Sequence, residues 1–403
     1  MVNKSIITNN TTVIDEQFEI TGFLKRHLRP DRYINERSQK YTARELHELN
    51  RQVIEIFQKE PTLANLSPPC YIVGDIHGQY RDLIRILNLQ RSGLKVEHNS
   101  PDFGAGFNTH RYMFLGDFVD RGAFSTECIS LVFGLKIVYP KQIILLRGNH
   151  ETKSVNFAYG FREELVNKLG EKDGIEVWEH FNEAFSWMPL AGLVGGKILC
   201  MHGGISPALN SLDDIRNIKR PIIDLNENKL ALDLLWSDPL DNGNINTVDG
   251  EPKYLKNPQR GLSCTFNGGA IRECVMKLNI QLIVRGHQVQ DPGFKFTSDR
   301  KLVTIFSAPN YMKENDNLGA VLTVGENGSL RIRILRPIEK GAKRSEHEVT
   351  RGDLSDTDND KKKEQKTQSL MKSCPSSSSI KSKRSKSKRS KKSSLKKAPK
   401  SDK

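Results

Sequence analysis

The sequence predicts an α/β fold, and three features of its 403 residues carry that prediction. Five short apolar runs are typical of buried strands, and each ends at or near a glycine, as a tight turn after a strand requires. Segments with helical apolar spacing lie between several of these runs. Residues suited to binding metal or phosphate gather where the runs end, which is where α/β sheets place their sites. The five stretches are Tyr71–Gly78, Arg111–Gly122, Ile143–His150, Ile198–Gly204 and Leu282–His287.

Helical spacing first appears after Tyr41. Thr42 and Glu45 have the spacing of a capping box, and an apolar face follows until Pro61 stops the run. Two segments are predicted to be irregular, Ser92–His110 and Asp238–Gly261. Further helices are expected around Leu83–Leu87, in Ser125–Tyr139, Arg162–Lys168, Ile175–Ser186, Asp213–Ile218 and Lys229–Trp236, and further strands in Leu302–Phe306 and Leu330–Leu335.

Charge divides the chain into parts. The whole sequence has a net charge of +14, but residues 361–403 hold seventeen Lys or Arg and two acids, so residues 1–360 are close to neutral. We therefore expect a disordered polar lead-in at residues 1–16, a catalytic domain at 17–338 and a disordered basic tail at 339–403, because the tail has too few apolar residues to fold.

Cysteine usage and hydropathy bear on the compartment. The six cysteines form no CxxC pair, and several sit in apolar runs, which favours a reducing environment. The start of the chain lacks the apolar core of a signal peptide, and no run is long enough to span a bilayer. An intracellular protein, cytoplasmic or nuclear, is expected.

Six residues at the strand ends have the chemistry of metal ligands. Two carboxylates, three imidazoles and one amide oxygen, with no thiolate, suit two divalent metal ions, with manganese preferred and iron or zinc as alternatives. Asp117, at the middle strand, is our choice for a carboxylate that bridges both metals. The six are Asp75, His77, Asp117, Asn149, His202 and His287.

Phosphate chemistry is indicated by the residues beside these ligands. Arg121 and Arg260 offer guanidinium forks that match phosphate oxygens. His150 is placed to protonate a leaving alkoxide, and Asp120 to orient that imidazole. Each motif alone has an ordinary explanation, since a Gly-Asp pair is usually a turn and an Asp-Arg pair usually a structural ion pair. Their coincidence at five similar strand ends favours a site.

At these residues the chain resembles the PPP family of metal-dependent serine/threonine protein phosphatases. Gly74–Gly78, Gly116–Gly122 and Arg147–Glu151 are similar to its three signature motifs. The remaining motifs are similar to His202–Gly204, Arg260–Gly261, Gly286–Gln288 and Ser307–Tyr311.

The resemblance implies a calcineurin-like metallophosphoesterase fold, with a central β-sandwich of mixed sheets flanked by helices. It implies one metal on Asp75, His77 and Asp117, and a second on Asp117, Asn149, His202 and His287. It also implies His150 as proton donor, Arg121, Arg260 and Asn149 as substrate contacts, and Tyr311 on the rim.

Within the family the first motif is most similar to the type-one phosphatases. The chain departs from the type-one pattern at Pro258-Gln259, at Met312-Lys313 and at Phe157, which replaces an arginine. None of these positions is a metal ligand, so they bear on substrate choice and toxin sensitivity.

The predicted function is therefore hydrolysis of phosphoserine and phosphothreonine in proteins by attack of a metal-bridging hydroxide. Two alternatives stay open: a two-metal phosphoesterase acting on nucleotides, and a catalytically weak, phosphatase-like binding protein whose basic tail does the work.

Two partner predictions accompany this function. Regulatory proteins are expected at a hydrophobic groove formed by Leu282, Phe296, Leu330 and Ile332, although core packing also explains all four. The tail is expected either to contact polyanions or serve as a nuclear-import signal, tuned by phosphorylation, or to be a dispensable solvated segment.

Overall fold

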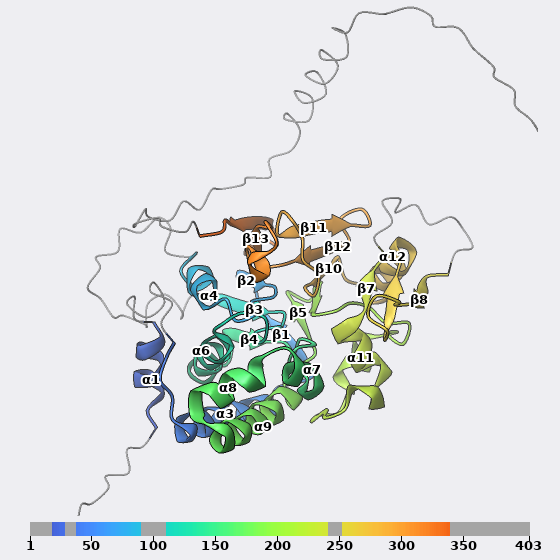
Figure 1. Ribbon diagram of the computed structural model, residues 1–403. Coiled ribbons are helices and arrows are strands. Elements are labelled where there is room, and N and C mark those ends of the chain that lie inside the picture. The colour runs from blue at the N-terminus through green and yellow to red at the C-terminus, as the bar shows by residue number, and fades with distance from the viewer. Residues whose placement is uncertain (1–17, 29–37, 90–109, 241–251, 339–403) are drawn as a thin grey trace, which may run out of the picture. The chain divides into compact units, whose positions relative to one another are not determined.

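The computed structural model describes residues 18–28, 38–89, 110–240 and 252–338, all within the compact unit Met1–Leu354 (Figure 1). The lead-in at 1–16, nearly all of the Ser92–His110 loop and the tail at 339–403 lie outside the described residues. The domain boundaries expected there stay predictions.

Two sheets form the centre of the described fold. In the six-stranded sheet the order is β1 (Leu63–Leu66), β5 (Ala191–Val194), β6 (Ile198–Met201), β10 (Leu282–Arg285), β12 (Leu302–Ile305) and β11 (Phe294–Thr297). In the five-stranded sheet it is β14 (Leu330–Leu335), β13 (Gly319–Val324), β2 (Cys70–Val73), β3 (Arg111–Phe114) and β4 (Ile143–Leu145). Both sheets mix parallel and antiparallel pairs.

Alternate residues of the central strands face two different cores, because successive side chains of a strand point to opposite faces. In β3, Tyr112 and Phe114 join the core beneath the helices, while Met113 packs in the core between the sheets. In β6, Cys200 joins the core between the sheets and Leu199 the core on the far side. Burial on both faces explains why these strands read as continuous apolar runs.

Helices cover the two outer faces of this sandwich. On the five-stranded sheet lie α1, α3, α4, α6, α8 and α9, which share one core with it (Figure 1). Helices α10, α11 and α12 share a core with the six-stranded sheet. The helices are α1 (Ile20–His27), α3 (Ala43–Lys59), α4 (Tyr80–Leu87), α6 (Ser125–Val138), α7 (Lys153–Ala158), α8 (Phe161–Leu169), α9 (Glu171–Ser186), α10 (Leu212–Arg216), α11 (Lys229–Trp236) and α12 (Gly268–Lys277), with 3-10 turns at Leu225–Glu227 and Tyr311–Lys313.

The predicted fold class, a β-sandwich of mixed sheets flanked by helices, is confirmed. The capping box at the start of α3 is present, with Thr42 and Glu45 bonded to each other's backbone N–H. Residues 241–251 of the predicted irregular segment Asp238–Gly261 lie outside the described residues, and the described part is not wholly irregular. A small third sheet of β7 (Asp238–Pro239), β9 (Cys264–Phe266) and β8 (Tyr254–Lys256) forms there, because β9 supplies the pairing partner for both short strands.

Candidate active site

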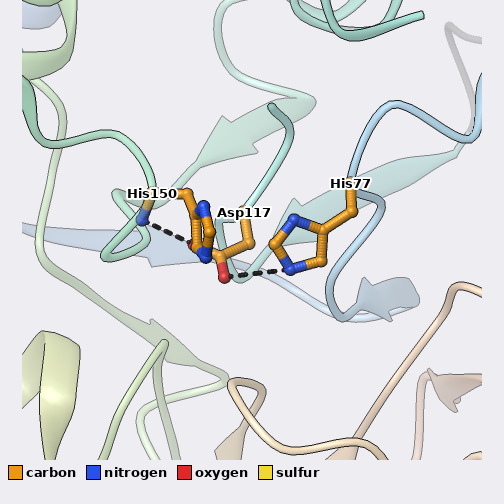
Figure 2. Close-up of side chains that lie close together, drawn as sticks. All are labelled: His77, Asp117 and His150. Atoms are coloured by element: carbon orange, nitrogen blue, oxygen red, sulfur yellow. Dashed lines mark hydrogen bonds and ion pairs between the residues drawn. The ribbon is translucent and has the colours of Figure 1, made fainter. Parts of the chain in front are cut away.

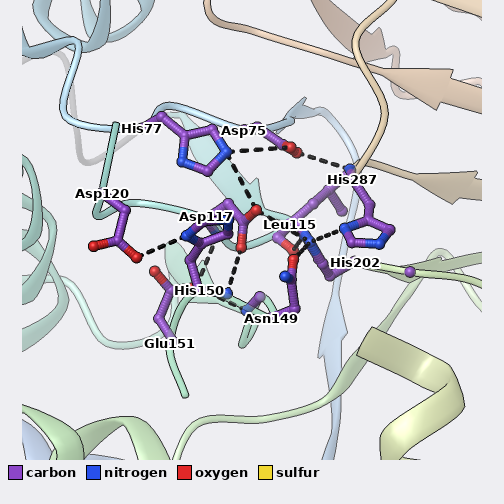
Figure 3. Close-up of polar contacts among 12 residues, drawn as sticks. Asp75, His77, Leu115, Asp117, Asp120, Asn149, His150, Glu151, His202 and His287 are labelled. Carbon is purple, nitrogen blue, oxygen red and sulfur yellow. Dashed lines mark hydrogen bonds and ion pairs between the residues drawn. The ribbon is translucent and has the colours of Figure 1, made fainter. Parts of the chain in front are cut away.

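The predicted ligands come together because the strands that carry them end at the same edge of the sandwich. Strands β2, β3 and β4 are parallel neighbours in one sheet, so the turns after them bring Asp75, Asp117 and Asn149 side by side. Strands β6 and β10 are parallel neighbours in the other sheet and deliver His202 and His287 to the same place (Figure 3).

The turns at this edge adopt a backbone that few residues favour. His77, Asp117 and His287 all have positive φ, between 46° and 69°. Left-handed backbone at a non-glycine residue costs of order 1–3 kcal/mol and is concentrated at functional sites. Two glycines make room for carboxylates: a Cβ at Gly148 would lie 2.2 Å from Asp117 Oδ1, and one at Gly286 would lie 2.4 Å from Asp75 Oδ1.

Asp117 lies at the centre of the cluster and belongs to two groups of side chains that can hold a metal ion. Its Oδ2 is 3.3 Å from His77 Nε2 and 3.3 Å from His202 Nε2. Figure 2 shows it between His77 and His150, with the backbone N–H of His150 donating to Asp117 Oδ1 at 3.0 Å. A carboxylate shared in this way has the placement expected of a metal bridge.

Further donor atoms converge on the second group. His202 Nε2 is 2.8 Å from Asn149 Oδ1 and 3.1 Å from His287 Nδ1. The first group consists of His77, Asp117 and His150, and Asp75 lies next to it, with Oδ2 3.9 Å from His77 Nε2. All six predicted ligands are buried and lie in one cluster.

Hydrogen bonds to backbone carbonyls orient two of the histidine rings as metal ligands. His77 Nδ1 lies 2.9 Å from the carbonyl of Val119, and His202 Nδ1 lies 3.2 Å from that of Leu115. An N–H donated outward to a carbonyl leaves the Nε2 lone pair of each ring facing the centre, the arrangement typical of metal-binding histidines. His287 turns its Nδ1 toward the same centre, 3.1 Å from His202 Nε2. The residues present therefore fit divalent metal ions.

Electrostatics in the cluster favour charge on Asp117. Burial alone would raise its pKa, but the charges of His202 and His150 and hydrogen bonds from His202 and His77 hold that pKa well below its ordinary value. Burial lowers the pKa of His77, yet Asp117 outweighs burial and raises it to about 9. Asp117 is thus ionised in the cluster, which is the state in which a carboxylate binds a cation.

His150 is held by Asp120. The Nδ1 of His150 lies 2.7 Å from Asp120 Oδ2, and the other oxygen of Asp120 accepts from the backbone N–H of Phe161 at 2.9 Å. Asp120 is fully buried and His150 nearly so. The two side chains are therefore in contact, and their acid–base role stays a prediction. His150 also lies within metal-binding reach of His77 and Asp117.

The two predicted phosphate-binding arginines line the same cavity but are held differently. Arg121 has its guanidinium 4.0 Å from the ring of Tyr159. Arg260 donates from Nε to Asp238 Oδ2 at 2.9 Å and from Nη2 to the carbonyl of His287 at 3.3 Å. Asp238 also pairs with the buried Arg285 at 3.0 Å.

Sequence reasoning missed Asp238, which fixes Arg260, and the positioning contacts of Glu151. The carboxylate of Glu151 accepts from the backbone N–H groups of Asp117, Phe118 and Gly148 at 2.8–2.9 Å. Burial and the charge of Asp117 raise the pKa of Glu151 to about 7. Glu151 lay within a recognised motif, whereas Asp238 gave no signal beyond its place after a helical segment.

The cavity at the site has a volume of about 380 Å³. Tyr311 lines it, with its ring 5.2 Å from that of His77, which agrees with the predicted rim position. His202 and Asp120 are fully buried and are not among its lining residues. The lining residues are Asp75, His77, Asp117, Arg121, Asn149, His150, Arg260, His287, Gln288, Val289, Phe306 and Tyr311.

The residues of the predicted docking groove lie away from this cavity and differ in burial. Leu282 and Ile332 are buried in the core between the sheets, and Phe296 packs against that core. Leu330 is 38% exposed. Core packing accounts for the first three, and the docking role stays a prediction.

The fold and this donor cluster are those of a metal-binding hydrolase. A family model described as calcineurin-like phosphoesterase matches residues 68–291, more than half of the chain, so the chain belongs to that family. This confirms the metallophosphoesterase fold that the resemblance implied. None of the helices in the described ranges is long and apolar enough to cross a membrane.

Solved structures also align with this chain. A serine/threonine phosphatase from Saccharomyces cerevisiae, itself described as similar to human phosphatase PP5, is 29% identical. The alignment covers 80% of this chain and 97% of the yeast chain, with a TM-score of 0.64. A cold-active protein-tyrosine phosphatase of a Shewanella species is 16% identical over 70% of this chain and 81% of its own, with a TM-score of 0.46.

Proposed function

We propose that this protein is a metal-dependent protein phosphatase that hydrolyses phosphoserine and phosphothreonine. The observation that carries the proposal is Asp117, shared by two converging donor groups in a cavity that two arginines also line. Support also comes from the yeast structure, a serine/threonine phosphatase whose alignment covers four-fifths of this chain.

Asp117 is shared by both metal ions in this proposal, and each of the other ligands belongs to one ion. Asp75, His77 and Asp117 would hold one divalent ion, and Asp117, Asn149, His202 and His287 the other. When bound, the two ions supply Lewis acidity and a water ionised at neutral pH. His77 and His202 are pre-oriented for this task by the backbone carbonyls that accept their outward N–H groups.

The other residues act on the substrate. Arg121 and Arg260 bind the phosphate oxygens and stabilise charge that develops on them. Asp238 holds the Arg260 fork in place, so little side-chain entropy is lost when phosphate binds. His150 gives a proton to the leaving oxygen of serine or threonine, and Asp120 keeps the imidazole in the orientation for that transfer.

The test offers matched phosphoserine and phosphothreonine peptides and a panel of nucleotides to the purified protein with manganese. Hydrolysis of the peptides with a higher kcat/KM than any nucleotide supports the proposal. A preference for nucleotides would replace it with a nucleotide phosphoesterase. Absence of hydrolysis of every substrate by metal-loaded protein would favour a phosphatase-like binding protein.

A further inference from the structure

Two aromatic side chains stand exposed beside the cavity, at the end of α7 and in the turn to α8. Phe157 is 59% exposed and Tyr159 is 45% exposed. Among the described residues, no other aromatic side chain belongs to the exposed large hydrophobic residues. We call Phe157, Tyr159 and Arg162 the α7–α8 patch.

Arg162 gives this patch a cation whose hydrogen-bond donors are unused. Its guanidinium lies 5.2 Å from the centre of the Phe157 ring and 5.9 Å from that of Trp178. Within the described part of the chain, the side chain of Arg162 makes no hydrogen bond and no ion pair. A guanidinium stacked on a ring keeps its planar fork open to a carboxylate.

Of the two cations that lie over Trp178 in the described part of the chain, Arg162 is the one without an ion pair. Lys153, the other cation over Trp178, is already paired with Glu179 at 2.7 Å. Trp178 is only 4% exposed and donates its ring N–H to Asn156 at 2.7 Å, so it forms the floor of the patch.

The patch is continuous with the candidate active site. The guanidinium of Arg121 lies 4.0 Å from the centre of the Tyr159 ring. The centres of the Tyr159 and His150 rings are 5.4 Å apart. The backbone N–H of Arg121 also donates to the carbonyl of Tyr159 at 3.3 Å. Phe157 precedes Tyr159 by two residues at the end of α7, so the patch borders the candidate active site through Tyr159.

We propose that the α7–α8 patch binds the segment of a phosphoprotein that flanks the phosphorylated residue, with an acidic side chain on Arg162 and an apolar one on Phe157. This inference rests on the proposed function. The competing explanation, that Phe157 only covers Trp178, does not account for a ring that leaves most of its own surface in water.

The experiment uses phosphoserine peptides in which a Glu-Leu pair is moved along both sides of the phosphoserine, and a parent peptide with Gln-Ser instead. Wild type is compared with Arg162→Gln and Phe157→Ser. Met276→Ser is the matched control, since Met276 is 74% exposed and lies on α12. The readouts are kcat/KM for each peptide and for 4-nitrophenyl phosphate, which has no flanking chain.

We expect wild type to prefer at least one Glu-Leu position by about three- to fivefold in kcat/KM. Arg162→Gln and Phe157→Ser should each reduce that preference, and added salt should weaken the Arg162 part. Hydrolysis of 4-nitrophenyl phosphate should be unchanged. The inference is overturned if no Glu-Leu position is preferred, if both variants keep the preference, or if they slow every substrate alike.

Failure of the proposed function would look different, because wild type would then hydrolyse no phosphopeptide. The patch is tested independently by fluorescence anisotropy with an unphosphorylated, dye-labelled Glu-Leu peptide. Weaker binding to Arg162→Gln than to wild type and Met276→Ser supports the patch. Equal binding to all three overturns it.

Discussion

Removing the imidazole of His150 should separate proton transfer from metal binding. In His150→Ala the backbone N–H that donates to Asp117 at 3.0 Å remains, because it belongs to the main chain. The six ligand side chains are untouched. What is lost is the ring that Asp120 holds at 2.7 Å, and with it the proton donor.

The size of the effect depends on the leaving group. A positioned general acid contributes typically about 10²–10⁴ in rate, or roughly 3–5 kcal/mol of activation free energy. An alkoxide needs that proton, whereas 4-nitrophenolate leaves largely without it. We therefore expect kcat on a phosphoserine peptide to fall by about 10²–10⁴ and kcat on 4-nitrophenyl phosphate to fall by less than about tenfold.

The assay measures kcat for both substrates on manganese-loaded protein and counts bound metal by mass spectrometry. His150→Asn is a useful companion, because its amide N–H can still donate to Asp120 while offering no acid. It should show the same leaving-group dependence. Equal losses on both substrates, or loss of bound metal in His150→Ala, would refute the role assigned to His150.

Three further predictions concern charge. Asp117→Asn should reduce turnover by about a thousandfold or more and lower bound metal, measured on the same samples, because the shared carboxylate loses its charge. Burial lowers the pKa of His27 from 6.5 to about 4, so between these pH values the unfolded chain binds a proton that the folded chain does not. The free energy of unfolding should therefore be highest above about pH 6.5 and fall by about 3 kcal/mol as the pH drops to 4. His27→Gln should flatten that slope in urea unfolding. Deleting Lys361–Lys403 should leave 4-nitrophenyl phosphate hydrolysis unchanged and abolish salt-sensitive DNA binding; truncated protein that binds DNA as before would show the tail to be dispensable.

Much of the fold could be predicted because the strands that build the site are buried on both faces. Such strands appear in the sequence as apolar runs. The glycines after them occupy positions where a side chain would collide with a neighbouring residue, as at Gly148 beside Asp117. Strands without these marks were missed. β1 contains Asn65, β5 contains Gly192, and β13 is apolar but carries no predicted ligand at its end.

The ligands were predictable for the same reason, since parallel strands in one sheet place their carboxyl ends together. What a sequence does not show is which polar residues support them. Asp238 lies on β7, a two-residue strand whose pairing depends on β9, and only that tertiary contact brings it to Arg260 and Arg285. Its role follows from the fold and not from any spacing.

Glu151 shows how the turns of the site depend on one another. The turn after β3 and the turn after β4 each have backbone N–H groups that the sheet does not satisfy, and Glu151 accepts from both. Asp117 has a left-handed φ of 54°, which is unfavourable in isolation, so the conformation that presents its carboxylate is held by contacts from the next turn. The position of the Asp117 carboxylate, our proposed metal bridge, thus depends on two turns and a buried carboxylate together. A change at Glu151 would act on Asp117 through the backbone without touching a ligand.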